Sequence, residues 1–171
     1  MEKILVLGSS GSGKSTFARQ LGQALNIKVL HLDSHYWLPD WTETTPEAWE
    51  KKLGNLLLQD QWVMDGNYTS SLEKRLSYAD TAIFLDISRT VCLTRCFRRL
   101  AQNWGRSRQE LAPGCYEKMD WEFFQWIWTY SRKRKPVILK MLNQQQAEVQ
   151  IILLKREQIA NFLAEQRMDV C

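Results

Sequence analysis

The sequence lacks any apolar run long enough to cross a membrane, and it contains only four cysteines. A transmembrane helix needs about 20 consecutive apolar residues, so we expect no membrane partner. The cysteines lack the density of a disulfide framework. A strand-like run that begins at Lys3 leaves no room for a signal peptide. Together these absences predict a cytoplasmic protein.

Internal repeats, linkers and low-complexity tracts are also missing, and side chains that favour zinc are sparse. Cys92 and Cys96 would share a helix face, as would His31 and His35 if that stretch were helical. Neither pair has the paired spacing of a zinc site. With 171 residues and an ordinary composition, we expect a single domain, 1–171, whose oligomeric state stays open.

One segment has no positive charge, and another has no negative charge. From Val29 to Glu50 there is no Lys or Arg, although five acidic residues fall there. From Arg95 to Arg108 there are five arginines and no acidic residue. A run of like charge is usually a solvated face. The use of Arg alone in the second run also suits phosphate, because a guanidinium offers a planar fork of donors.

What the sequence does contain is a loop of Gly and Ser between a strand-like and a helix-like run: KILVLGSSGSGKSTFARQL, from Lys3 to Leu21. Each glycine costs conformational entropy on folding, so the exposed backbone must serve a purpose. The spacing of Gly8, Gly13, Lys14 and Ser15 predicts a P-loop, whose backbone N–H groups form a nest for phosphate. A flexible Gly/Ser connector is the alternative interpretation.

A P-loop assigns a role to each of its residues. Lys14 is expected to reach the β- and γ-phosphates and Ser15 to ligate Mg²⁺, so ATP and Mg²⁺ are the predicted cofactors. The helix that follows adds its positive N-terminal dipole end to the phosphate site. The predicted nucleotide-binding residues of the loop are Gly8, Ser9, Ser10, Gly11, Ser12, Gly13, Lys14, Ser15 and Thr16.

Strand-like and helix-like segments alternate along the chain. This alternation predicts an α/β fold, a five-stranded parallel sheet with helices on both faces. Apolar runs such as AIFL and IILL fit strands that are buried on both sides. The expected strands are 3–7, 28–31, 61–65, 81–86 and 149–154. The expected helices after the first are 46–59, capped by Thr44 or Thr45, then 89–103 and 157–166.

In parallel sheets of this kind, ligands lie beyond the carboxyl ends of the strands. Asp33 follows the second strand and Asp65 ends the third, directly before Gly66. Asp65 is expected to hold Mg²⁺ as a Walker B aspartate does, and Asp33 to orient the acceptor or take its proton. Either residue could instead be an ordinary turn aspartate.

Four stretches resemble adenylate-kinase-like P-loop proteins labelled "DNA topology modulation protein". They are the P-loop, DGNY at Asp65, FLD of the fourth strand, and GRSRQELAPGCYEKMDWEFFQWIW at 105–128. The resemblance covers nearly the whole chain, and the last stretch is the one specific to this group. It implies a nucleoside-monophosphate-kinase type of P-loop NTPase fold with ATP at the loop. The label reports a genetic association, so it does not define the reaction.

Resemblance to true adenylate kinases implies further site residues. Arg95 and Arg99 stand where their helix carries two arginines that contact the ATP phosphates and adenine. The Pro and the AMP-binding Arg that follow their DG motif are missing here, although Arg75 lies close enough in sequence to contact an anion. The resemblance also implies a short lid at about 104–117, in which Arg108 would act as a clamp residue, as would Arg106. The plain alternative for the helix arginines is surface solvation.

The aromatic residues allow two interpretations. In WEFFQWIWTY, residues Trp121, Phe124 and Trp128 follow helical spacing, which favours core packing and leaves a stacking platform as the alternative. Trp37 and Trp41 lie in the acid-rich segment and could form a wall of the acceptor pocket.

Two functions follow from the sequence. The first is an ATP-dependent kinase that phosphorylates a small molecule, nucleotides included. Its predicted catalytic residues are Lys14, Asp33, Asp65, Arg95, Arg99 and Arg108, and its metal ligands are Ser15 and Asp65. The second is a nucleotide-regulated DNA-binding protein that affects DNA topology without kinase turnover, in which RKRK at 132–135 and the arginine-bearing helix at 89–103 hold the DNA backbone. The net charge of +4 is modest for a DNA-binding protein, which favours the kinase.

Overall fold

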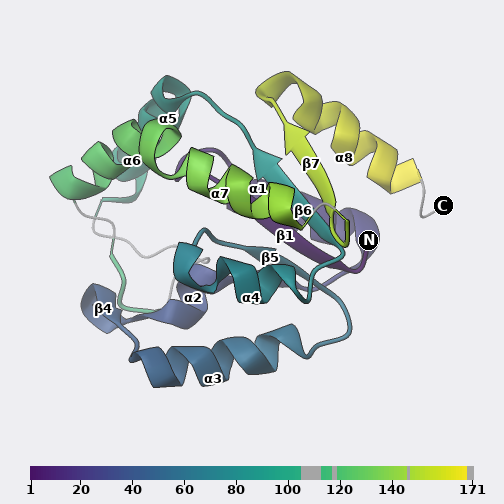
Figure 1. The fold of residues 1–171 in the computed structure, drawn as a ribbon. Helices are drawn as coiled ribbons and strands as arrows, with labels where there is room; N and C mark the ends of the chain where they lie inside the picture. The colour runs from purple at the N-terminus through teal and green to yellow at the C-terminus, as the bar shows by residue number, and fades with distance from the viewer. Residues whose placement is uncertain (105–112, 117–118, 146, 169–171) are drawn as a thin grey trace.

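The computed structural model describes residues 1–104, 113–116, 119–145 and 147–168. Its centre is a five-stranded sheet in the order β2–β5–β1–β6–β7, and every pairing in it is parallel (Figure 1). This confirms the expected parallel sheet. The strands are β1 (Lys3–Gly8), β2 (Val29–His31), β5 (Trp62–Asp65), β6 (Thr81–Leu85) and β7 (Gln150–Leu154).

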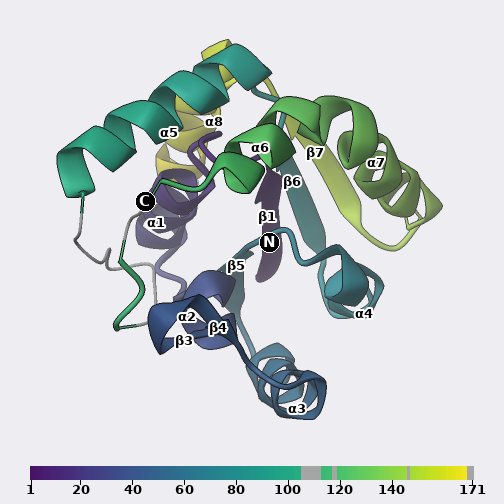
Figure 2. The same ribbon diagram turned by 90° about the vertical axis from the view of Figure 1, so that its left-hand side faces the viewer.

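Helices cover both faces of this sheet (Figure 2). One layer consists of α1 (Lys14–Leu25), α5 (Arg89–Asn103) and α8 (Ile159–Met168). The other consists of α3 (Pro46–Leu57), α4 (Leu72–Leu76) and α7 (Lys135–Gln144). Helix α6 (Trp121–Lys133) contributes side chains to both cores.

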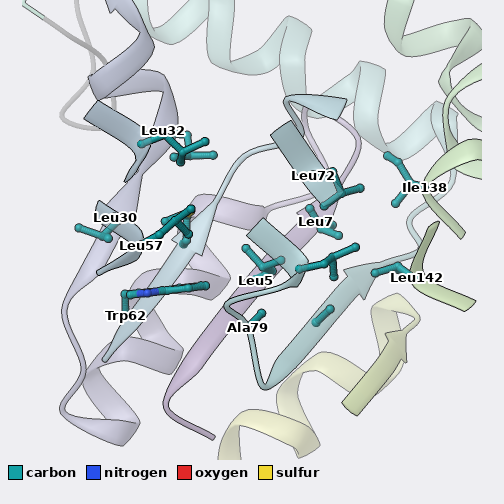
Figure 3. Packing of buried hydrophobic residues seen from close by; sticks show 14 of the residues in the cluster. Leu5, Leu7, Leu30, Leu32, Leu57, Trp62, Leu72, Ala79, Ile138 and Leu142 are labelled. Atoms are coloured by element: carbon teal, nitrogen blue, oxygen red, sulfur yellow. The ribbon is translucent and has the colours of Figure 1, made fainter. Parts of the chain in front are cut away.

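The central strand β1 shows how the two cores arise. Successive side chains of a strand point to opposite faces, so Leu5 and Leu7 enter one core while Ile4 and Val6 enter the other. Figure 3 shows the first core, in which Leu5 and Leu7 lie among side chains from the helices that cover this face. All four of these β1 residues are fully buried. The loop that follows β1 therefore starts from a rigid base.

The pairing of β1 places the ends of three strands side by side. Val6 pairs with Asp65 of β5, and Gly8 pairs with Leu85 of β6. On the far side of β5, His31 of β2 pairs with Asp65. The chain runs from β1 to β2 and β5 on one side of it and then crosses to β6 and β7 on the other side. The carboxyl end of β1 therefore lies at a topological switch point, where ligands of α/β proteins bind.

The structure tests the expected cap of α3 and the expected burial of two strands. Thr45 caps α3, since its Oγ1 accepts a hydrogen bond from the backbone N–H of Ala48 at 3.3 Å. Residues 82–85 are fully buried, as predicted for AIFL. The same prediction was wrong for IILL, because β7 is the edge strand of the sheet and Leu153 is 53% exposed.

Several elements were not expected. Between β2 and α3 the chain forms α2 (Leu32–Tyr36) and a small antiparallel hairpin of β3 (Trp37–Leu38) and β4 (Thr42–Glu43). The turn between these strands is the 3₁₀ segment η1 (Pro39–Trp41). Two further 3₁₀ segments, η2 (Thr69–Ser71) and η3 (Arg156–Gln158), precede α4 and α8. None of the helices in the described ranges is long and apolar enough to cross a membrane.

Candidate functional site

The loop between β1 and α1 has a backbone that only glycine adopts readily. Gly8, Gly11 and Gly13 have φ angles of 142°, 77° and 97°. A Cβ atom on Gly11 would lie 2.3 Å from the carbonyl oxygen of Cys92 and 2.8 Å from the sulfur of Cys96. Both contacts are far closer than packed atoms allow, so glycine is required here. The loop is thereby pressed against α5.

Lys14 is the first residue of α1 and lies half-buried inside this loop. Its ammonium donates a hydrogen bond to the carbonyl oxygen of Ser9 at 3.1 Å. Burial lowers the pKa of Lys14, and the carboxylates of Asp65 and Asp33 partly oppose this effect. The single ammonium of the loop thus lies within electrostatic reach of the two aspartates that the sequence singled out.

Asp65 joins the loop to strand β2. Its Oδ2 accepts a hydrogen bond from the Ser15 hydroxyl at 2.7 Å, and its Oδ1 accepts one from Nδ1 of His31 at 2.6 Å. The side chain of Asp65 is only 6% exposed. A serine hydroxyl beside a carboxylate is a pair of hard oxygen donors, which Mg²⁺ prefers. These two residues therefore fit the predicted metal site.

Arg95 reaches the same loop from α5. Its Nη1 donates to the carbonyl oxygens of Ser12 at 2.9 Å and Gly11 at 3.4 Å. Arg99 follows one helical turn later and is half-buried. The structure thus brings Lys14, Ser15, Asp65 and Arg95 together around one loop. Arg106 and Arg108, and most of the expected lid, lie outside the described residues.

Asp33 lies exposed on α2, beyond the carboxyl end of β2. Its Oδ1 accepts a hydrogen bond from the Tyr68 hydroxyl at 2.8 Å. Burial raises the pKa of Tyr68, and the neighbouring Asp33 carboxylate adds to this effect. The phenol is therefore neutral and serves as a fixed donor that orients the carboxylate.

Arg75, which lies close enough in sequence to contact an anion, is instead bound to the protein's own backbone. Its side chain is fully buried, with Nη1 donating to the carbonyl oxygen of Gly66 at 2.9 Å and Nη2 donating to those of Asn67 at 2.7 Å and Tyr68 at 3.1 Å. Burial lowers the pKa of Arg75 to about 9. The guanidinium stabilises the DGNY turn by binding three of its backbone carbonyls. Because these donors are already used, the structure does not support a contact between Arg75 and an anion.

Sequence reasoning missed two residues of the site, His31 and Asn67. The Oδ1 of Asn67 accepts hydrogen bonds from the backbone N–H of Gly8 at 3.3 Å and from the Tyr130 hydroxyl at 3.4 Å. It therefore links the start of the P-loop to α6. Both residues could have been found from their positions in the sequence. His31 is the last residue of β2, and Asn67 lies two residues after the end of β5.

The two tryptophans of the acid-rich segment lie next to the chain that leads into α6. Trp37 and Trp41 pack around the fully buried Cys115, with their ring centroids 5.6 Å apart. The indole N–H of Trp41 donates to the carbonyl oxygen of Tyr116 at 2.8 Å. Tyr36 continues this aromatic wall, since its ring contacts Trp37.

The aromatic helix α6 follows the core interpretation only in part. Phe124 and Tyr130 are buried, but Trp121 is 76% exposed and Trp128 is 46% exposed. The expectation that Trp121, Phe124 and Trp128 share a buried face was therefore wrong for the two tryptophans. The guanidinium of Arg89 lies 3.9 Å above the ring of Trp128, a cation–π arrangement at the surface.

No protein-family model matches the chain. A curated relative, "Uncharacterized protein YqaC" of Bacillus subtilis (strain 168), is 28% identical over 145 residues, which cover 84% of this chain and 80% of that protein. This relative does not confirm the resemblance to the "DNA topology modulation protein" family.

Solved structures with a similar fold include kinases. A gluconokinase from Sinorhizobium meliloti 1021 is 20% identical, with a TM-score of 0.56, over 98% of this chain and 90% of that one. A shikimate kinase from Acinetobacter baumannii in complex with shikimate is 17% identical, with a TM-score of 0.60, over 99% and 92% of the two chains. A shikimate kinase from Bacteroides thetaiotaomicron is 17% identical, with a TM-score of 0.59, over 98% of this chain and 97% of that one. The chain has the P-loop kinase fold. At these identities the likeness speaks for the fold alone.

Proposed function

We propose that the protein transfers the γ-phosphoryl group of ATP to a hydroxyl group of a small molecule. The observation that carries this proposal is the convergence on one loop of the Lys14 ammonium, the Ser15–Asp65 pair and the Arg95 guanidinium. The kinase-like fold supports nucleotide binding at this loop. No comparison favours the DNA-binding alternative.

Each residue has a separate task in this proposal. The P-loop amides and Lys14 hold the β- and γ-phosphates, and Arg95 adds positive charge on the α5 side. Ser15 and Asp65 would hold Mg²⁺, which neutralises charge on the transferring phosphoryl group. Arg99 and Arg108 stay predicted phosphate contacts. The single domain of residues 1–171, with a short lid at 104–117, also stays a prediction.

Asp33 is proposed to face the acceptor. The hydroxyl oxygen of the acceptor forms a bond to the γ-phosphorus, the bond between that phosphorus and the β,γ-bridging oxygen breaks, and ADP leaves. The hydroxyl proton passes to the Asp33 carboxylate, which Tyr68 holds in place. The protein contributes mainly positioning and charge, as is usual for phosphoryl transfer.

A coupled assay of ADP release over nucleosides, nucleotides and small alcohols tests this proposal. Lys14→Ala should lower the acceptor-dependent rate by about a hundredfold or more, the size expected when one group that stabilises the transition-state charge is lost. Lys51→Ala is the matched control, because Lys51 is exposed on α3. Equal rates for the parent and Lys14→Ala would contradict the assignment of the site.

A further inference from the structure

The acceptor side of the site differs in charge from the nucleotide side. The segment from Val29 to Glu50, which forms α2 and the β3–β4 hairpin, contains no Lys or Arg. The nearby guanidinium of Arg75 is held beneath the DGNY turn by three backbone carbonyls and cannot reach a ligand without breaking those bonds. Among the residues that the structure describes, this arginine is therefore committed to the protein's own backbone and not to an anionic acceptor.

Two basic side chains near α2, Lys52 and His35, also offer little positive charge to a ligand. The Lys52 ammonium donates to the carbonyl oxygen of His35 at 2.9 Å. Burial lowers the pKa of His35, and the positive charges of Lys52 and Lys28 lower it further. His35 is consequently uncharged near neutral pH.

Aromatic rings and carboxylates lie close together on α2, the hairpin and the segment after β5. The ring of Tyr36 lies between those of Trp37 and Tyr68, with centroid distances of 5.2 and 4.6 Å. The Tyr36 hydroxyl donates to Glu43 at 2.9 Å, as the Tyr68 hydroxyl donates to Asp33. Both phenol hydroxyl groups therefore donate their hydrogen bonds to carboxylates. Aromatic faces beside carboxylates attract neutral rings and cations and repel anions.

We propose that the acceptor is an alcohol that carries no anionic group, and that its ring or cationic head packs against Tyr36 and Trp37 while its hydroxyl meets Asp33. This inference rests on the proposed kinase function and narrows its substrate class. It assigns Asp33 and the aromatic wall the selection against nucleoside monophosphates and hydroxy acids.

Matched pairs of acceptors test the proposal directly. Suitable pairs are adenosine and AMP, thymidine and dTMP, glycerol and glycerate, and ethanolamine and glycolate, each supplied to the full chain with saturating magnesium ATP. The ratio kcat/KM for ADP release should be at least tenfold higher for the non-anionic member of each pair that is used. A higher kcat/KM for an anionic member would overturn the inference.

Asp33→Asn separates selection from folding. The asparagine side chain can still accept the Tyr68 hydrogen bond through its oxygen, but it removes the negative charge. We expect at least a tenfold fall in kcat for non-anionic acceptors and a smaller KM difference within each pair. Asp60→Asn, an exposed residue before β5 at the other end of the sheet, should change neither quantity. An unchanged KM difference in Asp33→Asn would overturn the role of this carboxylate.

The results distinguish this inference from the proposed function. If magnesium ATP binds and release depends on Lys14 but occurs only with anionic acceptors, the kinase function stands and the inference is wrong. If magnesium ATP binds but no member of any pair raises ADP release, the inference is also wrong. If Lys14→Ala releases ADP as fast as the parent with every acceptor, the proposed function fails instead.

Discussion

The proposed nucleotide side and the proposed acceptor side of this site are built in different ways. The nucleotide side is a contiguous loop, residues 8–16, whose backbone conformation and first helical turn carry the proposed binding groups. The proposed acceptor side is assembled from side chains that lie on α2, the β3–β4 hairpin and the segment after β5. A binding site made of backbone demands glycine, whereas one made of side chains demands a particular arrangement of distant elements.

The acceptor side also contains unusual backbone conformations that glycine does not supply. Asp40 and Trp41 both have φ angles of 59°, in the left-handed region, which is uncommon for a residue as bulky as tryptophan. The hairpin turn is held by hydrogen bonds to the segment before α6, from Asp40 N–H to the Gly114 carbonyl at 3.2 Å and from Trp41 to that of Tyr116. Such strain persists only where surrounding contacts over-determine it.

Arg75→Ala should produce the largest change in stability. It tests whether Arg75 stabilises the fold or instead binds an anionic acceptor. The substitution removes a fully buried guanidinium and leaves the carbonyls of Gly66, Asn67 and Tyr68 without their donors. We expect the free energy of unfolding to fall by about 3–5 kcal/mol, as for other buried charged groups that lose their hydrogen-bond network. Urea denaturation measures this change.

The control for Arg75 is Arg98→Ala, because Arg98 is exposed on α5. Its stability should stay within about 0.5 kcal/mol of the parent, as for most surface substitutions. If Arg75→Ala folded with parental stability and raised only the KM of an anionic acceptor, the two sides of the site would not differ as described.

Gly11→Ala tests the backbone character of the nucleotide side. A side chain at a φ of 77° costs about 1–3 kcal/mol, and its Cβ would overlap the Cys92 carbonyl. The loop must move away from α5, so the Kd for magnesium ATP should rise by about ten- to a hundredfold, at 1.4 kcal/mol for each factor of ten. Fluorescence titration with a labelled nucleotide gives this constant.

Gly54→Ala is the matched substitution, because a Cβ on this α3 glycine meets no atom within 4 Å. It should leave the Kd unchanged and raise stability by about 0.5–1 kcal/mol, the helix propensity difference between the two residues. Unchanged nucleotide affinity in Gly11→Ala would show that the loop does not bind through its backbone.

His31→Ala tests a side chain that links β2 to the P-loop through Asp65. We propose that His31 is a positioning residue, since its Nδ1 fixes the carboxylate that also accepts from Ser15. Loss of such a partner costs about tenfold in metal affinity or activity. The Mg²⁺ concentration for half-maximal nucleotide binding should rise by about this factor. His31→Asn, whose amide can donate to the same oxygen, should restore most of it.

The nucleotide side could be predicted from sequence because its determinants are local. The spacing from Gly8 to Ser15 requires a strand before it and a helix after it, and both were expected and found. Asp65 was placed correctly beside Ser15 because parallel strands bring their carboxyl ends to one edge. The five strands of the main sheet followed from the same alternation of elements.

The acceptor side resisted prediction because its determinants are tertiary. Arg75 lies close enough in sequence to contact an anion, yet whether a guanidinium binds a ligand or backbone carbonyls depends on packing that sequence spacing does not record. The hairpin from Trp37 to Glu43 was missed because its strands have two residues each, too short for an alternating pattern. Trp121 and Trp128 lie exposed although their helical spacing resembles that of core residues.

The central claim is that the loop from Gly8 to Ser15 encloses the phosphates of a nucleotide with the help of Lys14. Isothermal titration calorimetry with magnesium ATP tests this claim most directly. We predict one-to-one binding by the parent protein and binding that is at least tenfold weaker in Lys14→Ala. A natively folded parent protein that gives no binding heat at two different temperatures would contradict the account.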